Sequence, residues 1–167
     1  MVICVVPDFI NLDQSEPHLN AATIVPFDRP TIALLDRHMN SGLYTTLGYN
    51  PQAVRAVVEA KFDVSVLPDD GFAIQAYGVG DGIRSHVDNV ISPKYVGTSN
   101  PQRLRDITSV LFLNDNFDGG VLEFGDLGIR IKPKQGTLVV FSSTYKHEVT
   151  KVVFGRRFVV AQFWIKG

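Results

Sequence analysis

The residues best suited to chemistry, His86 and Asp88, lie in a short segment where small or apolar residues alternate with polar ones. Such alternation predicts a β-strand over residues 83–89, on which side chains two positions apart point to the same face. His86 and Asp88 would then aim an imidazole and a carboxylate at one point. These are two of the three ligands of a 2-His-1-carboxylate triad, which holds non-haem Fe(II) and leaves coordination positions open. A polar strand face would give the same pattern by chance, so the pair needs support from elsewhere in the chain.

A third ligand has to come from a later strand, and His147 is the histidine of the sequence that is placed to supply it. It follows a polar turn at residues 141–146, which we expect at the mouth of a barrel. The other histidines, His18 and His38, precede the strand-rich region, and we interpret them as surface residues. His86, Asp88 and His147 are therefore the predicted metal ligands and the predicted catalytic set.

A buried cation is predicted on the last strand, where Arg156 and Arg157 precede an apolar run. A guanidinium inside a barrel is costly unless it meets a carboxylate, and its planar fork suits bidentate carboxylate binding. We predict that Arg157 points inward and that Arg156 points to solvent. A shift of the strand by one residue would exchange the two roles. The alternative is that Arg157 is a surface charge on an edge strand.

The elements that must position these side chains are mostly short strands. Apolar residues at 2–6 predict a first strand, and from Phe72 onward runs of strand-forming residues are separated by Gly, Asn, Asp and Pro. The later strands are predicted at residues 72–78, 83–89, 106–114, 120–124, 128–132, 136–142, 147–153 and 156–165. Strands without intervening helices favour a sandwich or a barrel.

Two helices are predicted ahead of these strands. One covers Pro30–Met39, with apolar residues at helical spacing, and the other follows Asn50 as N-cap and Pro51 as first helical residue. Helices followed by strands fit a mainly β, α+β chain that forms a double-stranded β-helix, or jelly roll, with helices on one face.

The length of 167 residues favours a single domain over residues 1–167, with helical support over 1–69 and the jelly-roll core over 70–165. A net charge of −1 and the lack of a basic stripe argue against nucleic acid as a partner. The single cysteine, Cys4, fits a reducing compartment, so a cytoplasmic location is expected. The apolar start is too short for a signal peptide or a membrane span. No membrane partner is expected.

Several motifs occur in an order that resembles the iron(II)- and 2-oxoglutarate-dependent dioxygenases. They are Tyr77–Gly80, His86–Asn89, Ile107–Asn114, Phe117–Phe124, Gly136–Phe141, His147–Val149 and the segment from Arg157 to Trp164. The resemblance spans roughly residues 70–165. Within that superfamily the chain is most similar to the prolyl 4-hydroxylase branch, and the segments at His86 and His147 resemble the oxygen-sensing prolyl hydroxylases.

This resemblance implies that His86, Asp88 and His147 hold Fe(II) and that Arg157 binds the distal carboxylate of the cosubstrate 2-oxoglutarate. Tyr77 matches a tyrosine that lines the cosubstrate or substrate pocket.

One position departs from the pattern of the oxygen-sensing enzymes. They usually have a tyrosine where this chain has Phe112, and its hydroxyl helps the arginine to hold the distal carboxylate. We expect Thr108, Ser142 or Tyr77 to replace that hydroxyl.

The implied activity is hydroxylation of an unactivated C–H bond with O2, which converts 2-oxoglutarate to succinate and CO2, with ascorbate as a supporting reductant. The preferred substrate is a proline-containing peptide or protein, over which the segment Val90–Arg105 would close. The alternatives are hydroxylation of a free amino acid or other small molecule, and a non-catalytic cupin-like metal protein. A nucleic-acid demethylase is disfavoured because Val153 stands where those enzymes usually have an arginine. The oligomeric state is left open.

Overall fold

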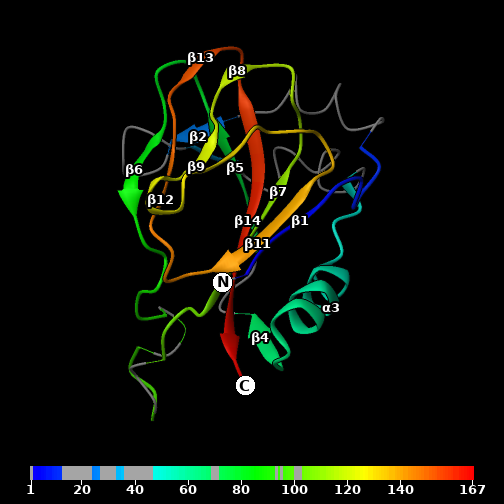
Figure 1. Ribbon diagram of the computed structural model, residues 1–167, viewed down its shortest axis with the longest axis vertical. Coiled ribbons are helices and arrows are strands. Elements are labelled where there is room, and N and C mark those ends of the chain that lie inside the picture. Colours follow the sequence, from blue (N-terminus) through cyan, green and yellow to red (C-terminus); the bar gives the residue numbers. More distant parts are fainter. Residues whose placement is uncertain are drawn as a thin grey trace.

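Antiparallel strands dominate the computed structural model of the protein (Figure 1). The structure describes residues 2–12, 24–26, 33–35, 47–68, 72–92, 94, 96–99 and 103–167. The predicted surface histidines His18 and His38 lie outside these residues.

The larger sheet has the strand order β1-β11-β7-β14-β5-β3-β2, and β4 pairs with the end of β14. Its strands are β1 (Ile3–Val6), β2 (Ile24–Pro26), β3 (Ala33–Leu35), β4 (Val66–Pro68), β5 (Ala73–Tyr77), β7 (Ile107–Phe112), β11 (Leu138–Ser142) and β14 (Arg157–Lys166). All of these pairs are antiparallel.

The smaller sheet has the order β10-β9-β12-β6. Its strands are β6 (Ile83–His86), β9 (Leu122–Phe124), β10 (Ile129–Ile131) and β12 (His147–Val149), with a 3-10 helix, η2 (Gly125–Leu127), between β9 and β10. A short pair, β8 (Asp118–Gly119) and β13 (Val152–Phe154), lies at the upper end of the barrel in Figure 1. The predicted mainly β, double-stranded β-helix fold is confirmed.

The central strands of the larger sheet are buried on both faces. On β7, Leu111 packs into a cluster with helix α3 (Pro51–Phe62), whereas Val110 and Phe112 pack into a second cluster between the two sheets. The inner cluster comprises Tyr77, Val110, Phe112, Leu122, Phe124, Val139, Phe141, Val149, Val152 and Val159. Because side chains alternate along a strand, Thr108 shares the inner face of β7 with Val110.

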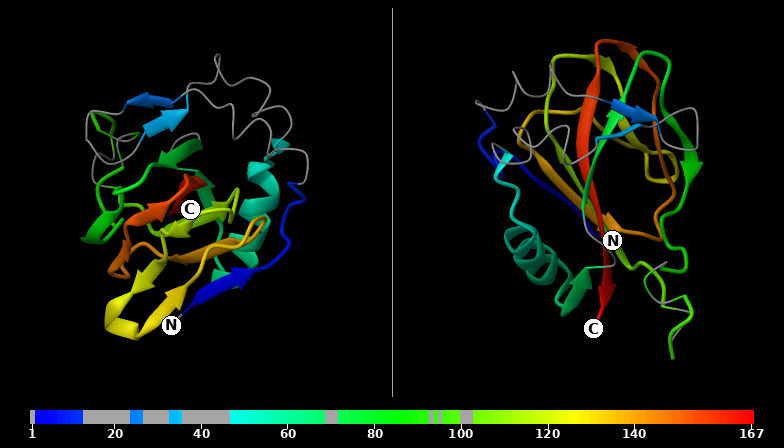
Figure 2. Two further views of the ribbon diagram at one scale, coloured as in Figure 1. Left: turned by 90° about the horizontal axis from the view of Figure 1, so that it is seen from above. Right: turned by 180° about the vertical axis from the view of Figure 1, so that it is seen from behind.

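Helix α3 begins where the sequence predicts. The Asn50 side chain accepts hydrogen bonds from the backbone N–H groups of Gln52 and Ala53, at 2.9 and 3.3 Å, and Pro51 occupies the first helical position. Val54 and Val58 are fully buried on the face that meets the larger sheet. Figure 2 shows the helix on the outer side of that sheet, away from the smaller one. The helix therefore supports the barrel from outside.

The helix predicted over Pro30–Met39 is wrong where the structure describes it. Ala33–Leu35 form the strand β3, which pairs with both β2 and β5. Pairing on both sides satisfies the backbone of this segment, and such tertiary pairing overrides a helical spacing of apolar residues. The larger sheet thus extends into a region that the sequence assigned to helical support.

Two predicted strands are shorter than expected. The strand predicted over residues 83–89 ends at His86, so Asp88 does not lie on it. The strand predicted over residues 147–153 divides into β12 and β13, which pair with different neighbours. Within the described part of the chain, no helix is long and apolar enough to cross a membrane.

The cap of α3 provides a test of the fold. We expect Asn50→Ala to lower the free energy of unfolding by about 1 kcal/mol, because two backbone N–H groups lose their acceptor. Urea denaturation would measure the loss. The control is Gln52→Ala, which changes an exposed residue of the same turn. Equal stability of the Asn50→Ala protein and the wild type would show that the cap does not stabilise α3.

Candidate metal and anion site

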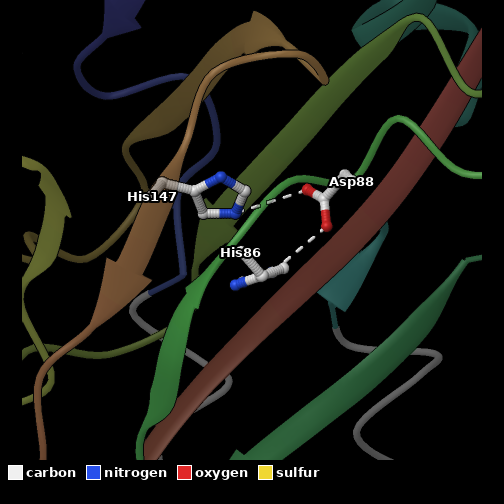
Figure 3. A group of neighbouring side chains, drawn as sticks. All are labelled: His86, Asp88 and His147. Carbon is white, nitrogen blue, oxygen red and sulfur yellow. Dashed lines mark ion pairs between the residues drawn. The ribbon is translucent and has the colours of Figure 1, made fainter. Parts of the chain in front are cut away.

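Three potential metal ligands converge between the sheets (Figure 3). His86 is the last residue of β6, and His147, the first residue of β12, pairs directly with it. Asp88 follows β6, and its Oδ1 and Oδ2 lie 3.3 Å from His86 Nε2 and 3.4 Å from His147 Nε2, respectively. Neighbouring ligands around one octahedral metal at ~2.1 Å would be ~3.0 Å apart. The three side chains are thus close to the spacing of a metal site.

The orientation of both imidazoles favours a cation at this point. His86 Nδ1 lies 2.8 Å from the Arg84 carbonyl oxygen, and His147 Nδ1 lies 2.9 Å from that of Tyr145. A carbonyl only accepts, so Nδ1 donates in both rings. In the neutral rings, Nε2 would then direct its lone pair at the Asp88 carboxylate. Such an arrangement requires a proton or a metal ion between the groups, and two imidazoles with one carboxylate suit Fe(II).

Two residues with hydroxyl side chains hold Asp88 in place: Thr108 on β7, and Ser143 directly after β11. The Thr108 hydroxyl donates to Asp88 Oδ2 at 2.9 Å and lies 2.9 Å from the Ser143 hydroxyl. The Ser143 carbonyl accepts hydrogen bonds from the backbone N–H groups of Asp88 and Asn89, both at 3.0 Å. These contacts replace the strand pairing that ends at His86 and fix both the backbone and the carboxylate of Asp88.

The electrostatics of the triad differ from residue to residue. The hydrogen bond with Asp88 raises the pKa of His86, whereas burial lowers the pKa of His147. Burial would raise the pKa of Asp88, but hydrogen bonds from His86 and Thr108 and the charge of His147 bring it below its usual value. Asp88 is therefore held as a carboxylate, the form that binds a metal.

Aromatic side chains enclose His147, which is only 5% exposed. Its ring centroid lies 4.8 Å from that of Phe141 and 5.8 Å from that of Phe124, and the His86 ring lies 4.3 Å away. His86 is half-exposed in comparison. The site is thus closed on the His147 side and open on the His86 side, where a substrate could approach.

Arg157 lies inside the same barrel, as predicted, and is 1% exposed. It pairs with Tyr77 across β14 and β5, and its guanidinium lies 4.5 Å from the centre of the Tyr77 ring and 5.5 Å from that of Phe112. Burial lowers the pKa of Arg157 and raises that of Tyr77. Gly120 makes room for the arginine, because a Cβ there would lie 2.7 Å from Arg157 Cδ. Arg156 is half-exposed.

Three buried side-chain polar atoms have no hydrogen-bond partner within the described residues, and we call them the open polar atoms. They are Arg157 Nε, Arg157 Nη1 and Thr137 Oγ1. Buried polar groups are nearly always hydrogen-bonded, so each of these atoms calls for a partner such as an ordered water molecule or a ligand. For an arginine the ligand should be an anion, with a carboxylate matching the fork best.

The other predicted cosubstrate residues have partners of their own. The Tyr77 hydroxyl donates to Gln75 Oε1 at 3.0 Å, and the Thr108 hydroxyl donates to Asp88. Ser142 Oγ lies 2.8 Å from Thr144 Oγ1 in the turn after β11. Contacts of Tyr77 and Thr108 with a cosubstrate stay predictions. Sequence reasoning missed Ser143 and Thr137, although the alternation along β11 would have placed Thr137 on the face of Val139.

Known proteins resemble this chain in both sequence and fold. Residues 72–166 match the family model of the 2OG-Fe(II) oxygenase superfamily. A "PKHD-type hydroxylase" of Caulobacter vibrioides is 35% identical over 135 residues, 78% of this chain and 55% of that protein. One of Teredinibacter turnerae is 30% identical over 155 residues, 89% of this chain and 62% of that protein. The chain therefore spans about half the length of the curated relatives it matches.

Solved structures with the same fold include prolyl hydroxylases. The viral collagen prolyl hydroxylase of Paramecium Bursaria Chlorella virus-1 has a TM-score of 0.72 at 17% identity, covering 99% of this chain and 96% of that one. A prolyl-4-hydroxylase of Pseudomonas putida has a TM-score of 0.66 at 20% identity, covering 99% and 92%. A Trichoplax adhaerens prolyl hydroxylase in complex with a hypoxia inducible factor peptide has a TM-score of 0.63 at 17% identity, covering 98% and 83%.

The ligand set can be tested by metal titration. We expect the protein to bind one Mn(II) or Co(II) ion, and both Asp88→Ala and His147→Ala to weaken binding by more than the ~10–100-fold cost of losing an outer-shell partner. Isothermal titration calorimetry would measure the affinity, with Asp126→Ala, an exposed carboxylate on η2, as the control. Metal binding that survives both substitutions would place the ion elsewhere.

The Thr108 hydroxyl gives a second test. Thr108→Val keeps the shape of the side chain but frees Asp88 Oδ2, so the affinity for Mn(II) should fall by ~10–100-fold. Thr108→Ser keeps the hydroxyl and should bind nearly as well as the wild type. Thermal unfolding of each variant without metal would separate an effect on the fold from one on the ligand. An unchanged affinity of Thr108→Val would mean that this hydrogen bond does not orient Asp88.

Proposed function

This chain belongs to the 2OG-Fe(II) oxygenase superfamily, and on that premise we propose that it is an Fe(II)- and 2-oxoglutarate-dependent dioxygenase that hydroxylates an unactivated C–H bond. The observation that carries the proposal is the pair of open polar atoms on Arg157, buried in the barrel that also holds the His-Asp-His triad. A dicarboxylate could neutralise two positive charges, that of a metal ion held by the triad and that of the Arg157 guanidinium.

Fe(II) would be held by His86 Nε2, His147 Nε2 and Asp88. When bound, it would supply the activation of O2 that couples oxidative decarboxylation of 2-oxoglutarate to hydroxylation, with ascorbate as a supporting reductant. The chain itself orients its ligands: the carbonyls of Arg84 and Tyr145 fix the imidazoles, as described above. The rings of Phe124 and Phe141 exclude water from the His147 side.

Arg157 would bind the distal carboxylate of 2-oxoglutarate. A guanidinium removed from water is stabilised when it meets a carboxylate. The resemblance to the 2-oxoglutarate-dependent dioxygenases implies the same role for Arg157. Tyr77 and Phe112 would line the cosubstrate pocket, since their rings lie nearest to the guanidinium. Thr108 would orient the Asp88 carboxylate, and its contact with the cosubstrate remains a proposal.

A proline-containing peptide is the proposed substrate. The relatives are named hydroxylases, and one structure of the same fold holds a peptide. Next to Asp88, four apolar residues are 40–49% exposed at the surface: Val87, Val90, Ile91 and Leu104. Ile91 and Leu104 form an isolated antiparallel bridge, flanked by hydrogen bonds from Ser92 N to Arg103 O at 2.8 Å and from Arg105 N to Val90 O at 3.1 Å. An X-Pro segment is already extended and would lose little conformational entropy on that surface.

We further propose that residues 1–167 form a single domain and that the protein is cytoplasmic, since its lone cysteine, Cys4, suits a reducing compartment. The proposal involves neither nucleic acid nor a membrane. A free amino acid or another small molecule as substrate, and a non-catalytic cupin-like metal protein, are the alternatives that the experiments below separate.

Cosubstrate anchoring predicts different effects for the two neighbouring arginines. Arg157→Ala should weaken 2-oxoglutarate binding strongly, because truncating one partner of a buried charge pair costs ~2–5 kcal/mol. Arg157→Lys keeps the charge without the fork and should lie in between, whereas Arg156→Ala should have little effect. The apparent requirement for 2-oxoglutarate in a succinate-formation assay would measure this. A larger effect of Arg156→Ala than of Arg157→Ala would contradict the proposed anchor.

Substrate class is tested by turnover. With Fe(II), 2-oxoglutarate and ascorbate, we expect proline-containing peptides to stimulate succinate formation and to gain one oxygen on the proline ring, as shown by mass spectrometry. Peptides in which alanine replaces proline are the matched controls. Oxygen transfer to a free amino acid alone, with peptides unmodified, would favour the small-molecule hydroxylase. Metal binding without any turnover would favour the non-catalytic alternative.

A further inference from the structure

Thr137, just before β11, has a buried hydroxyl to which the proposed function assigns no role. The residue is 4% exposed, and its Oγ1 is one of the open polar atoms. Among the described residues, the other open polar atoms all belong to Arg157. A buried hydroxyl without a partner costs free energy, so a ligand that satisfies both residues would explain both features at once.

The backbone holds Thr137 firmly inside the barrel. Phe112 N donates to the Thr137 carbonyl at 3.0 Å, and Gly136 N donates to the Phe112 carbonyl at 2.9 Å, so two residues oppose one as in a β-bulge. Gly136 has φ +76°, and a Cβ there would lie 2.5 Å from the Ile10 carbonyl oxygen. Thr137 lies opposite Phe112 and shares a sheet face with Val139, a member of the inner cluster.

Phe112 thus neighbours both residues that carry the open polar atoms. Its backbone pairs with Thr137, and its ring faces the Arg157 guanidinium at 5.5 Å. The phenylalanine has no polar side-chain atom and cannot hydrogen-bond an anion beside Arg157. The hydroxyls of Thr108, Ser142 and Tyr77 all have partners in the structure, whereas Thr137 Oγ1 is open.

We propose that the Thr137 hydroxyl donates a hydrogen bond to the same distal carboxylate that Arg157 binds, and so helps to select a dicarboxylic 2-oxo acid. This inference rests on the proposed function, because it assigns a further residue to the cosubstrate pocket. Arg157 supplies the charge, and Thr137 supplies a hydroxyl donor beside Phe112. Thr137 thereby provides the hydroxyl that Phe112 lacks.

The test compares two 2-oxo acids that differ in the distal carboxylate. Protein loaded with Mn(II) is titrated with 2-oxoglutarate and, separately, with 2-oxobutanoate, which has no distal carboxylate; calorimetry reports the affinities without turnover. The variants are Thr137→Val, which replaces the hydroxyl with a methyl group of similar size, Thr137→Ser, which retains the hydroxyl, and Thr144→Val as an exposed threonine control. Thermal unfolding shows whether each variant remains folded.

We expect Thr137→Val to weaken 2-oxoglutarate binding by about tenfold or more, the loss typical of one hydrogen bond to a charged group. Binding of 2-oxobutanoate should not change, and Thr137→Ser should restore the affinity for 2-oxoglutarate. Wild-type affinity of Thr137→Val for 2-oxoglutarate, or equal losses for both acids, would overturn the inference and leave the proposed function intact. A wild-type protein that binds no 2-oxoglutarate would overturn both.

Discussion

Burial of the Arg157 guanidinium is the constraint on which the rest of the site depends. A charge removed from water is costly, and the open polar atoms show that the described part of the chain does not meet that cost by itself. The Tyr77 and Phe112 rings lie against the guanidinium, and their cation–π contacts offset part of this desolvation cost. Arg157 Nε and Nη1 are left without partners among the described residues, and an anion bound there would satisfy them.

The triad complements this charge. With neutral imidazoles and an ionised Asp88, a divalent metal leaves one net positive charge at the triad, and Arg157 adds another. A dicarboxylate dianion would neutralise both, which makes the barrel interior electrically balanced only when metal and cosubstrate are bound together. His86 and His147 pair directly in the smaller sheet, whereas Arg157 lies on β14 of the larger sheet. In the proposed function, the cosubstrate would therefore contact residues of both sheets.

The sequence alone determined the class of fold, the types of ligand and most of the strands. The mostly apolar run Ile107–Phe112 is buried at every position, and such a run indicates locally that a strand is covered on both faces. Asn50 and Pro51 marked the start of α3 because a helix cap is itself a local structure. Residue type made four candidate site residues recognisable: His86, Asp88, His147 and Arg157. Burying a charged or polar side chain costs free energy, so such residues on predicted barrel strands indicate a binding role.

Only the tertiary structure decided which partners those residues have. Ala33–Leu35 became a strand because β2 and β5 flank it, and Asp88 was placed by Thr108 and Ser143 rather than by a continuing strand. The bulge that positions Thr137 beside Phe112 also depends on pairing between distant segments. Local periodicity fixes which face a side chain takes within its own strand. The register between strands, and with it every hydrogen bond across the barrel, is set by pairing energies summed over the whole sheet.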